Sequence, residues 1–138
     1  MSKKCPDLFA AIHVGSDQIS LQIVEYRSLD DIRVVERAKR EVSLGEETFK
    51  TGCVSFSSVS EICELLKGYG RMLAEYGVKD YRLMATTALR EAQNQHYIID
   101  QIRVKTGFSV EVVDMPQEIY YKYVALFKTA AENGLAED

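Results

Sequence analysis

Short stretches of this sequence carry residue types that could bind and cleave a phosphate group. The turn Gly15-Ser16-Asp17-Gln18 lies between two apolar runs. Glycine lets backbone N–H groups come close to a phosphate oxygen, and the Ser16 hydroxyl adds a donor. An ordinary β-hairpin has the same pattern, so this turn alone does not decide between a phosphate loop and a hairpin.

A second stretch with phosphate-binding chemistry follows another apolar run. Thr86 and Thr87 offer hydroxyl donors, and Arg90 has a planar fork that can grip a phosphate through two hydrogen bonds. The alternative for Arg90 is a surface ion pair with Glu91 or Asp100. The pattern therefore indicates an anion site, and the surface ion pair of Arg90 is the alternative interpretation.

An acidic residue completes the candidate set. Glu118, predicted in the first turn of a helix, could accept a proton from water, although first-turn acids also simply complement the helix dipole. Binding sites in α/β sheets gather at the carboxyl ends of strands. We therefore expect the segments 15–18, 86–90 and 115–118 to meet at one rim of the fold.

Apolar spacing predicts an α/β domain that positions these segments. Strands are predicted over residues 9–14, 19–26, 32–44, 81–85 and 108–113, and helices over 57–76, 94–106 and 116–133. Residues 45–56 are predicted as a polar connection. Ser58 and Glu61 have capping-box spacing, and Tyr97, Ile98 and Ile102 are expected to face inward. The order β-β-β-α-β-α-β-α indicates a mixed five-stranded sheet with helices on its faces.

Composition bounds the class of protein. The 138 residues, 46% hydrophobic and 28% charged, suit a single globular domain over 1–138, with 130–138 as a frayed end or linker. A net charge of −4 argues against a nucleic-acid polymer or a membrane surface as partner. No apolar run approaches a membrane span, so the cytoplasm is the expected location.

The sequence predicts no protein metal site. Cys5, Cys53 and Cys63 lack C-x-x-C spacing and are expected to be free thiols. His13 could ligate a metal or titrate near neutral pH, but no second histidine or carboxylate is spaced with it. We therefore interpret His13 as a hydrogen-bonded histidine at a strand end, and His96 as a surface residue.

Three stretches carry a family resemblance: residues 10–16 (AAIHVGS), 42–46 (VSLGE) and 85–94 (ATTALREAQN). They resemble the N-terminal domain of the exopolyphosphatase/guanosine pentaphosphate phosphohydrolase family, within the actin-like, sugar-kinase, heat-shock-70 superfamily. The third stretch is the most specific, because it follows the family pattern Ala-Thr-x-Ala-x-Arg-x-Ala-x-Asn. The similarity covers nearly the whole chain.

The resemblance implies a ribonuclease H-like domain, one of two lobes that close around a phosphate-binding cleft. The family removes the terminal phosphate of inorganic polyphosphate or the 5′ phosphate of guanosine pentaphosphate, usually with Mg²⁺. The resemblance places the catalytic glutamate at Glu118, the arginine that binds substrate at Arg90 and the first phosphate loop at residues 15–18. Magnesium is expected in the full-length protein and not in this domain alone.

Several positions depart from the family pattern. His13 stands where the family has an aspartate associated with metal and water, and Asp17 and Gln18 replace an asparagine and a small hydroxyl residue. The Asp17 carboxylate would repel a phosphate that an amide would bind. Residues 115–120 (MPQEIY) lack the arginine of the pattern Gly-x-Glu-Glu-Ala-Arg. The family's second phosphate loop would follow Asp138.

Two hypotheses of different class follow. In the first, the chain is the N-terminal lobe of a phosphatase, inactive alone because half a cleft leaves the transition state open to water. In the second, it is a degenerate domain that binds a nucleotide, polyphosphate or a protein without hydrolysis. Arg90 and Glu118 favour the first, and His13 and Asp17 the second. We adopt the phosphatase hypothesis, in which the missing C-terminal lobe is the partner. A homodimer formed through apolar residues of the predicted last helix, which that lobe would otherwise cover, is the alternative assembly.

Overall fold

The computed structural model describes residues 7–28 and 31–113 of the chain. In these ranges the elements are β1 (Asp7–Val14), β2 (Gln18–Ser28), β3 (Asp31–Glu41), α1 (Leu44–Thr51), α2 (Phe56–Tyr76), β4 (Asp80–Ala85), α3 (Thr87–Glu91), α4 (Gln95–Thr106) and β5 (Glu111–Val112). Glu118, the predicted helix over 116–133 and the predicted linker over 130–138 lie outside the described residues. No described helix is long and apolar enough to cross a membrane.

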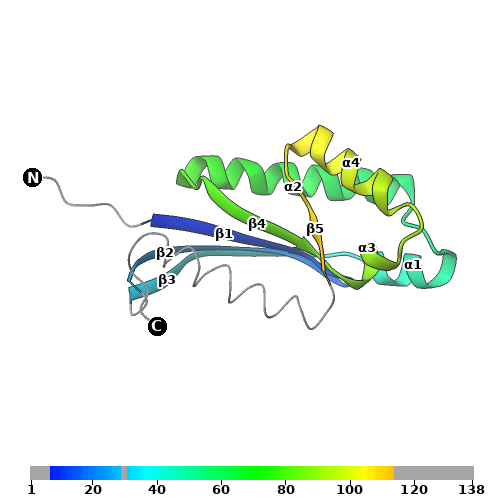
Figure 1. Ribbon diagram of the computed structural model, residues 1–138, viewed down its shortest axis with the longest axis horizontal. Coiled ribbons are helices and arrows are strands. Elements are labelled where there is room, and N and C mark those ends of the chain that lie inside the picture. The colour runs from blue at the N-terminus through cyan, green and yellow to red at the C-terminus, as the bar shows by residue number, and fades with distance from the viewer. Residues whose placement is uncertain (1–6, 29–30, 114–138) are drawn as a thin grey trace, which may run out of the picture.

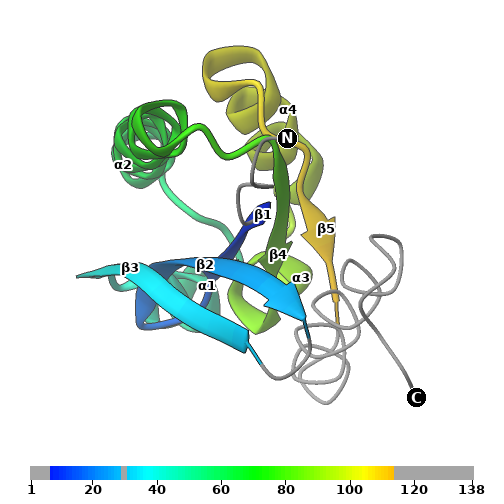
Figure 2. The same cartoon turned by 90° about the vertical axis from the view of Figure 1, so that its left-hand side faces the viewer.

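The strands form the mixed five-stranded sheet that the sequence predicts. Their order is β3-β2-β1-β4-β5. The β1–β2 and β2–β3 pairs are antiparallel, whereas β4 runs parallel to both β1 and β5. Helices α2 and α4 lie over one face of this sheet (Figure 1), and an end-on view shows the strands fanning apart from β3 to β5 (Figure 2).

The core lies between the sheet and these two helices. Alternate strand residues point toward it, among them Ile12, Leu21 and Leu83, and each is at most 2% exposed. Leu66 of α2 and Ile98 of α4 meet them from the helix side and are fully buried. The alternate residues of the strands and the apolar faces of the two helices therefore pack into a single core.

Helix α2 begins at a different cap from the predicted one. Ser55 is the N-cap and its side chain accepts a hydrogen bond from the Ser58 N–H at 3.2 Å. The predicted capping box of Ser58 with Glu61 is wrong, because Ser58 already lies inside the helix and its hydroxyl donates to Glu47. Partial burial acts to raise the pKa of Glu47, but hydrogen bonds from the Ser55 N–H and the Ser58 hydroxyl together lower it. Gly77 ends the helix at φ 75°, as predicted.

Two helices occupy segments where the sequence predicts none. The expected strand over 32–44 ends at Glu41, and α1 replaces the first part of the expected polar connection. Leu44 and Thr48, one turn apart, are both buried, and Gly52 at φ 81° caps the helix. The short helix α3 forms directly after β4. Both helices lie at the sheet end where β1 and β4 finish (Figure 1).

Helix α4 agrees with the prediction except at one residue. Ile98 and Ile102 are fully buried, and Gly107 ends the helix at φ 83°. Tyr97 was predicted to face inward, and this prediction is wrong: the side chain is 42% exposed. Its ring instead lies against Phe56 of α2, with ring centroids 5.4 Å apart. The pair therefore links the starts of α2 and α4 at the surface.

Candidate functional site

The turn after β1 is a tight hairpin closed by its own backbone. The Gly15 N–H donates to the Gln18 carbonyl at 2.9 Å. A Cβ at position 15 would meet His13 Cε1 at 3.0 Å and the Gln18 carbonyl oxygen at 3.2 Å, so glycine fits the close packing. The Gly15 N–H is therefore used inside the turn and is not available to a ligand.

Helix α1 begins directly against this turn. The Gly45 N–H donates to the Ser16 carbonyl at 3.1 Å, and the Val42 N–H donates to the Asp17 carbonyl at 2.8 Å. A Cβ at position 45 would lie 2.7 Å from Ser16 Cβ, closer than side chains pack. We infer that glycine at 45 is what allows α1 to approach the turn.

A cleft of about 420 Å³ lies between the turn, α1 and α3. Its lining residues come from these three segments: Ser16, Gly45, Thr48, Phe49, Thr87, Ala88 and Glu91. The structure therefore brings Ser16 and Thr87 together, at the carboxyl ends of the adjacent parallel strands β1 and β4. Phe49 and Glu91 are not among the residues singled out from the sequence. The sequence does contain signals for α1, the helix that carries Phe49. They are the acids at 46 and 47 in its first turn, Lys50 in its last turn and the glycine at 52 that ends it.

The neighbouring hydroxyl, Thr86, does not line this cleft. Thr86 is 3% exposed, and its Oγ1 lies 3.3 Å from His13 Nε2. Its N–H donates to the Val14 carbonyl at 3.2 Å and so continues the β1–β4 pairing. The two predicted threonines thus differ: Thr86 packs against the imidazole of His13, and Thr87 faces the cleft.

The other predicted loop residues lie in a separate depression. Asp17 and Gln18 line a hollow of about 460 Å³ together with Glu41, Val42 and Ser43. Within 7–28 and 31–113, no three His, Cys, Asp or Glu side chains are grouped so that they could hold a metal ion. His13, an imidazole, stands where the family resemblance implies an aspartate associated with metal and water.

Arg90 lies at the end of α3, beside the last described strand. Its Nε is 3.3 Å from Glu91 Oε2, so one of the two surface pairs considered from the sequence is present, while Asp100 is paired within α4. Its Nη1 donates to the Val113 carbonyl at 3.3 Å. Arg90 therefore borders the point from which the chain continues toward Glu118, five residues after Val113.

The asparagine that ends the family-like stretch has a structural role. The Asn94 side chain accepts from the Val54 N–H at 3.2 Å and donates to the Val54 carbonyl at 2.9 Å. Thr48 Oγ1 donates to the Ala88 carbonyl at 3.1 Å, which joins α1 to α3. These bonds hold α1, and with it one wall of the cleft, against the segment that carries Arg90.

Comparison with known proteins decides the family. Residues 22–136 match the Ppx/GppA phosphatase family. The chain belongs to this family. A crystal structure of the Aquifex aeolicus Ppx/GppA family member is 28% identical, with a TM-score of 0.80 over 88% of this chain and 40% of that one. Exopolyphosphatase 1 of Mycobacterium tuberculosis is 19% identical over 83% of this chain and 33% of its own length.

A second type of relative has a different arrangement. The bifunctional 3-dehydroquinate synthase/phosphatase of Fusobacterium nucleatum is 22% identical over 84% of this chain and 18% of its own length. The chain thus spans about a third or less of the curated relatives it matches. The resemblance drawn from the sequence is confirmed, and the Ppx/GppA domain has the ribonuclease H-like fold that it implied.

Proposed function

We propose that this Ppx/GppA domain forms the phosphate-binding half of a site that hydrolyses phosphoanhydride bonds. The substrate would be the terminal phosphate of inorganic polyphosphate or the 5′ phosphate of guanosine pentaphosphate. One observation carries the proposal: the hydroxyl-bearing residues Ser16 and Thr87 line a common cleft at the ends of two parallel strands. Membership of a phosphatase family supports it.

In the proposed reaction a water oxygen attacks the terminal phosphorus while the bridging P–O bond breaks. Ser16 and Thr87 donate hydrogen bonds to the phosphate oxygens, and Arg90 stabilises the charge that develops on them. Glu118 takes the proton from the attacking water. The roles of Arg90 and Glu118 rest on the family resemblance, and Glu118 lies outside the described residues.

A second lobe is part of the proposal. Charge that develops on a transferring phosphoryl group is stabilised only when donors surround it and water is excluded. The cleft described here has walls from one domain, so we propose that the C-terminal lobe of the family closes it and that this domain alone does not hydrolyse its substrate. Magnesium in the two-lobe protein and a cytoplasmic location stay predictions.

Binding of inorganic tripolyphosphate to the purified chain tests the proposed cleft. We expect Ser16→Ala combined with Thr87→Val to weaken binding about tenfold, because each lost hydrogen bond is worth roughly 0.5–1.5 kcal/mol. Isothermal titration calorimetry measures the effect. Ser60→Ala, an exposed serine of α2 outside the cleft, is the matched control and should leave the affinity unchanged. Equal affinity of the double variant and the parent chain would contradict the proposed cleft.

A degenerate, non-hydrolysing domain is the second candidate, favoured by His13 and Asp17. The His13 ring is already engaged with Thr86, and Asp17 adds negative charge next to the Ser16 turn. If the domain is degenerate, His13→Asp with Asp17→Asn should raise phosphate release in the two-lobe protein by about tenfold or more, because Asp17→Asn removes a carboxylate that repels phosphate and His13→Asp restores the residue that the family resemblance implies. A phosphate-release assay on parent and double variant decides. Full activity of the parent would exclude degeneracy.

A further inference from the structure

Helix α3 ends in a different way from the other described helices. Helices α1, α2 and α4 each end at a glycine with positive φ, at positions 52, 77 and 107. Such a glycine turns the chain so that the next N–H groups bond to the last carbonyls of the helix. Helix α3 ends instead at Ala92, whose backbone is extended at φ −73° and ψ 132°. The last carbonyls of this short helix therefore need a donor from another part of the chain.

The side chain of Gln95 is that donor. Its Nε2 donates to the Leu89 carbonyl and to the Arg90 carbonyl, each at 3.1 Å. Both partners are acceptors, so the amide must turn its NH2 group toward them. One side chain thus holds the last turn of α3, including the backbone of Arg90.

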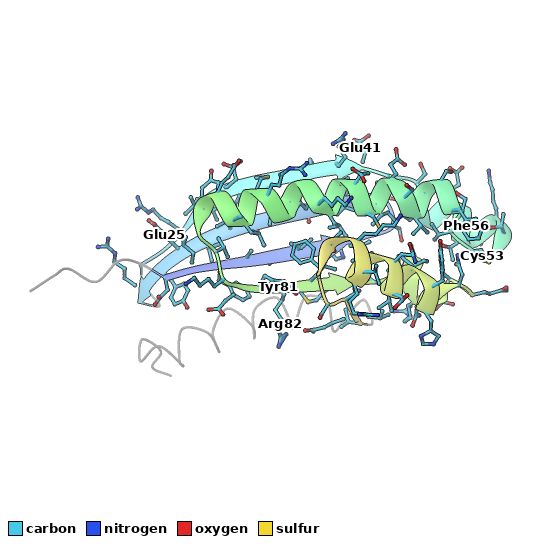
Figure 3. All side chains as sticks on the ribbon, turned by 90° about the horizontal axis from the view of Figure 1, so that it is seen from above. Glu25, Glu41, Cys53, Phe56, Tyr81 and Arg82 are labelled. Atoms are coloured by element: carbon cyan, nitrogen blue, oxygen red, sulfur yellow. The ribbon has the colours of Figure 1, made fainter. Side chains whose placement is uncertain are left out.

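The start of α4, where Gln95 lies, is itself held to the start of α2. The Asn94 side chain bonds to both backbone groups of Val54, and the Tyr97 ring packs against Phe56. Figure 3 shows α2 and α4 side by side over the strands, with Phe56 at the end where both helices begin. Gln95 therefore links α3 to a well-anchored turn of the domain.

The position of Arg90 depends on this link. Its side chain is 31% exposed and pairs at 3.3 Å with Glu91, and a surface ion pair of this kind holds a side chain only weakly. A long side chain also shifts whenever the backbone that carries it moves. The two bonds from Gln95 fix the end of α3, and they restrict where the Arg90 guanidinium can lie.

We propose that Gln95 is a positioning residue for Arg90. The inference rests on the proposed function, in which the Arg90 guanidinium stabilises the charge that develops on the phosphate. A group that acts in the transition state loses its effect when it is displaced, whereas the affinity for the substrate changes little. In the two-lobe protein acting on polyphosphate, Gln95→Ala should lower kcat about tenfold and change KM by about twofold or less.

A double-mutant cycle separates positioning from a general loss of structure. When Arg90→Ala is already present, adding Gln95→Ala should change kcat by about twofold or less, because the group that Gln95 positions is gone. Gln95→Glu keeps the size of the side chain but turns a carboxylate toward two carbonyl oxygens, so it should lower kcat at least as much as Gln95→Ala. Gln101→Ala is the matched control, because it removes the same amide from another half-buried position of α4 and should keep kcat.

A second measurement needs no substrate. The Arg90 N–H donates to the Thr86 carbonyl at 2.9 Å inside α3, and the Ile98 N–H donates to the Asn94 carbonyl at 3.1 Å in α4. Hydrogen exchange of the purified chain, followed by NMR, should be about tenfold faster at the Arg90 amide in Gln95→Ala and unchanged at the Ile98 amide, because only α3 loses its support. A general loss of stability would speed exchange at both amides.

The outcomes separate this inference from the proposed function. A loss of kcat in Arg90→Ala with none in Gln95→Ala would overturn the role of Gln95 and leave the phosphate site standing. So would equal losses from Gln95→Ala with and without the arginine, or unchanged exchange at the Arg90 amide. Unchanged kcat in Arg90→Ala would instead overturn the part that the proposed function gives to Arg90, and the positioning role with it.

Discussion

Replacing Arg90 by alanine is expected to lower kcat/KM for phosphate release from polyphosphate about 10²–10³-fold, the cost of removing one preorganised donor from a transition state. The measurement uses the protein in which this domain is joined to the second lobe of its family. Arg90 borders Glu91 and the Val113 carbonyl at the end of β5. Under the proposed function its guanidinium stabilises the phosphate that is attacked by a water molecule activated by Glu118.

The Arg90 variant needs a control for lost packing. Arg82 Nη1 of β4 lies 3.4 Å from Glu111 Oε1 of β5, and its side chain is 35% exposed against 31% for Arg90, so Arg82→Ala removes a comparable ion pair elsewhere on the surface. We expect Arg82→Ala to keep nearly full activity, and Arg90→Lys to recover part of it because lysine keeps the charge without the fork. Similar losses for both alanine variants would assign Arg90 a structural role only.

The requirement for a second lobe is checked in the same assay. This domain alone should release no phosphate from polyphosphate, because half of the cleft is open to water. Phosphate release by the chain alone, abolished by Glu118→Gln, would contradict that requirement. The Arg90 prediction would then be tested directly on the single domain.

Local patterns were enough to predict most of the fold. The stripe that includes Leu66 and the stop at Gly77 predicted α2, and alternation predicted the paired strands. Helix α1 was missed because Leu44 extends the alternation of β3, which outweighed the first-turn acids and the glycine at 52 that favour a helix. Tyr97 was misplaced because Phe56, a partner distant in sequence, holds its ring at the surface.

The candidate site was predictable only as far as topology determines it. Parallel strands β1 and β4 necessarily bring their following residues to one rim, and Ser16 and Thr87 do share a cleft. Which of two adjacent threonines faces that cleft depends on the contact between Thr86 and His13, which no sequence pattern shows. Phe49 and Glu91 entered the site only because α1 and α3 form its walls.

Leu66→Ala is expected to lower the free energy of unfolding by about 3–4 kcal/mol, within the range for emptying a fully buried leucine site. Leu66 is 0% exposed in α2, in the core between that helix and the sheet. Domains are typically stable by about 5–15 kcal/mol, so this loss removes a large share of the total. Urea unfolding followed by circular dichroism measures it.

Leu65, the next residue of the same helix, is the matched control for this cavity. It is only partly buried against the core, so Leu65→Ala removes the same atoms and leaves water free to fill much of the space. We expect a loss of about 1 kcal/mol or less there, because the solvent-facing part of the side chain contributes little burial. Equal losses at the two positions would mean that α2 does not press against the sheet along the face described here.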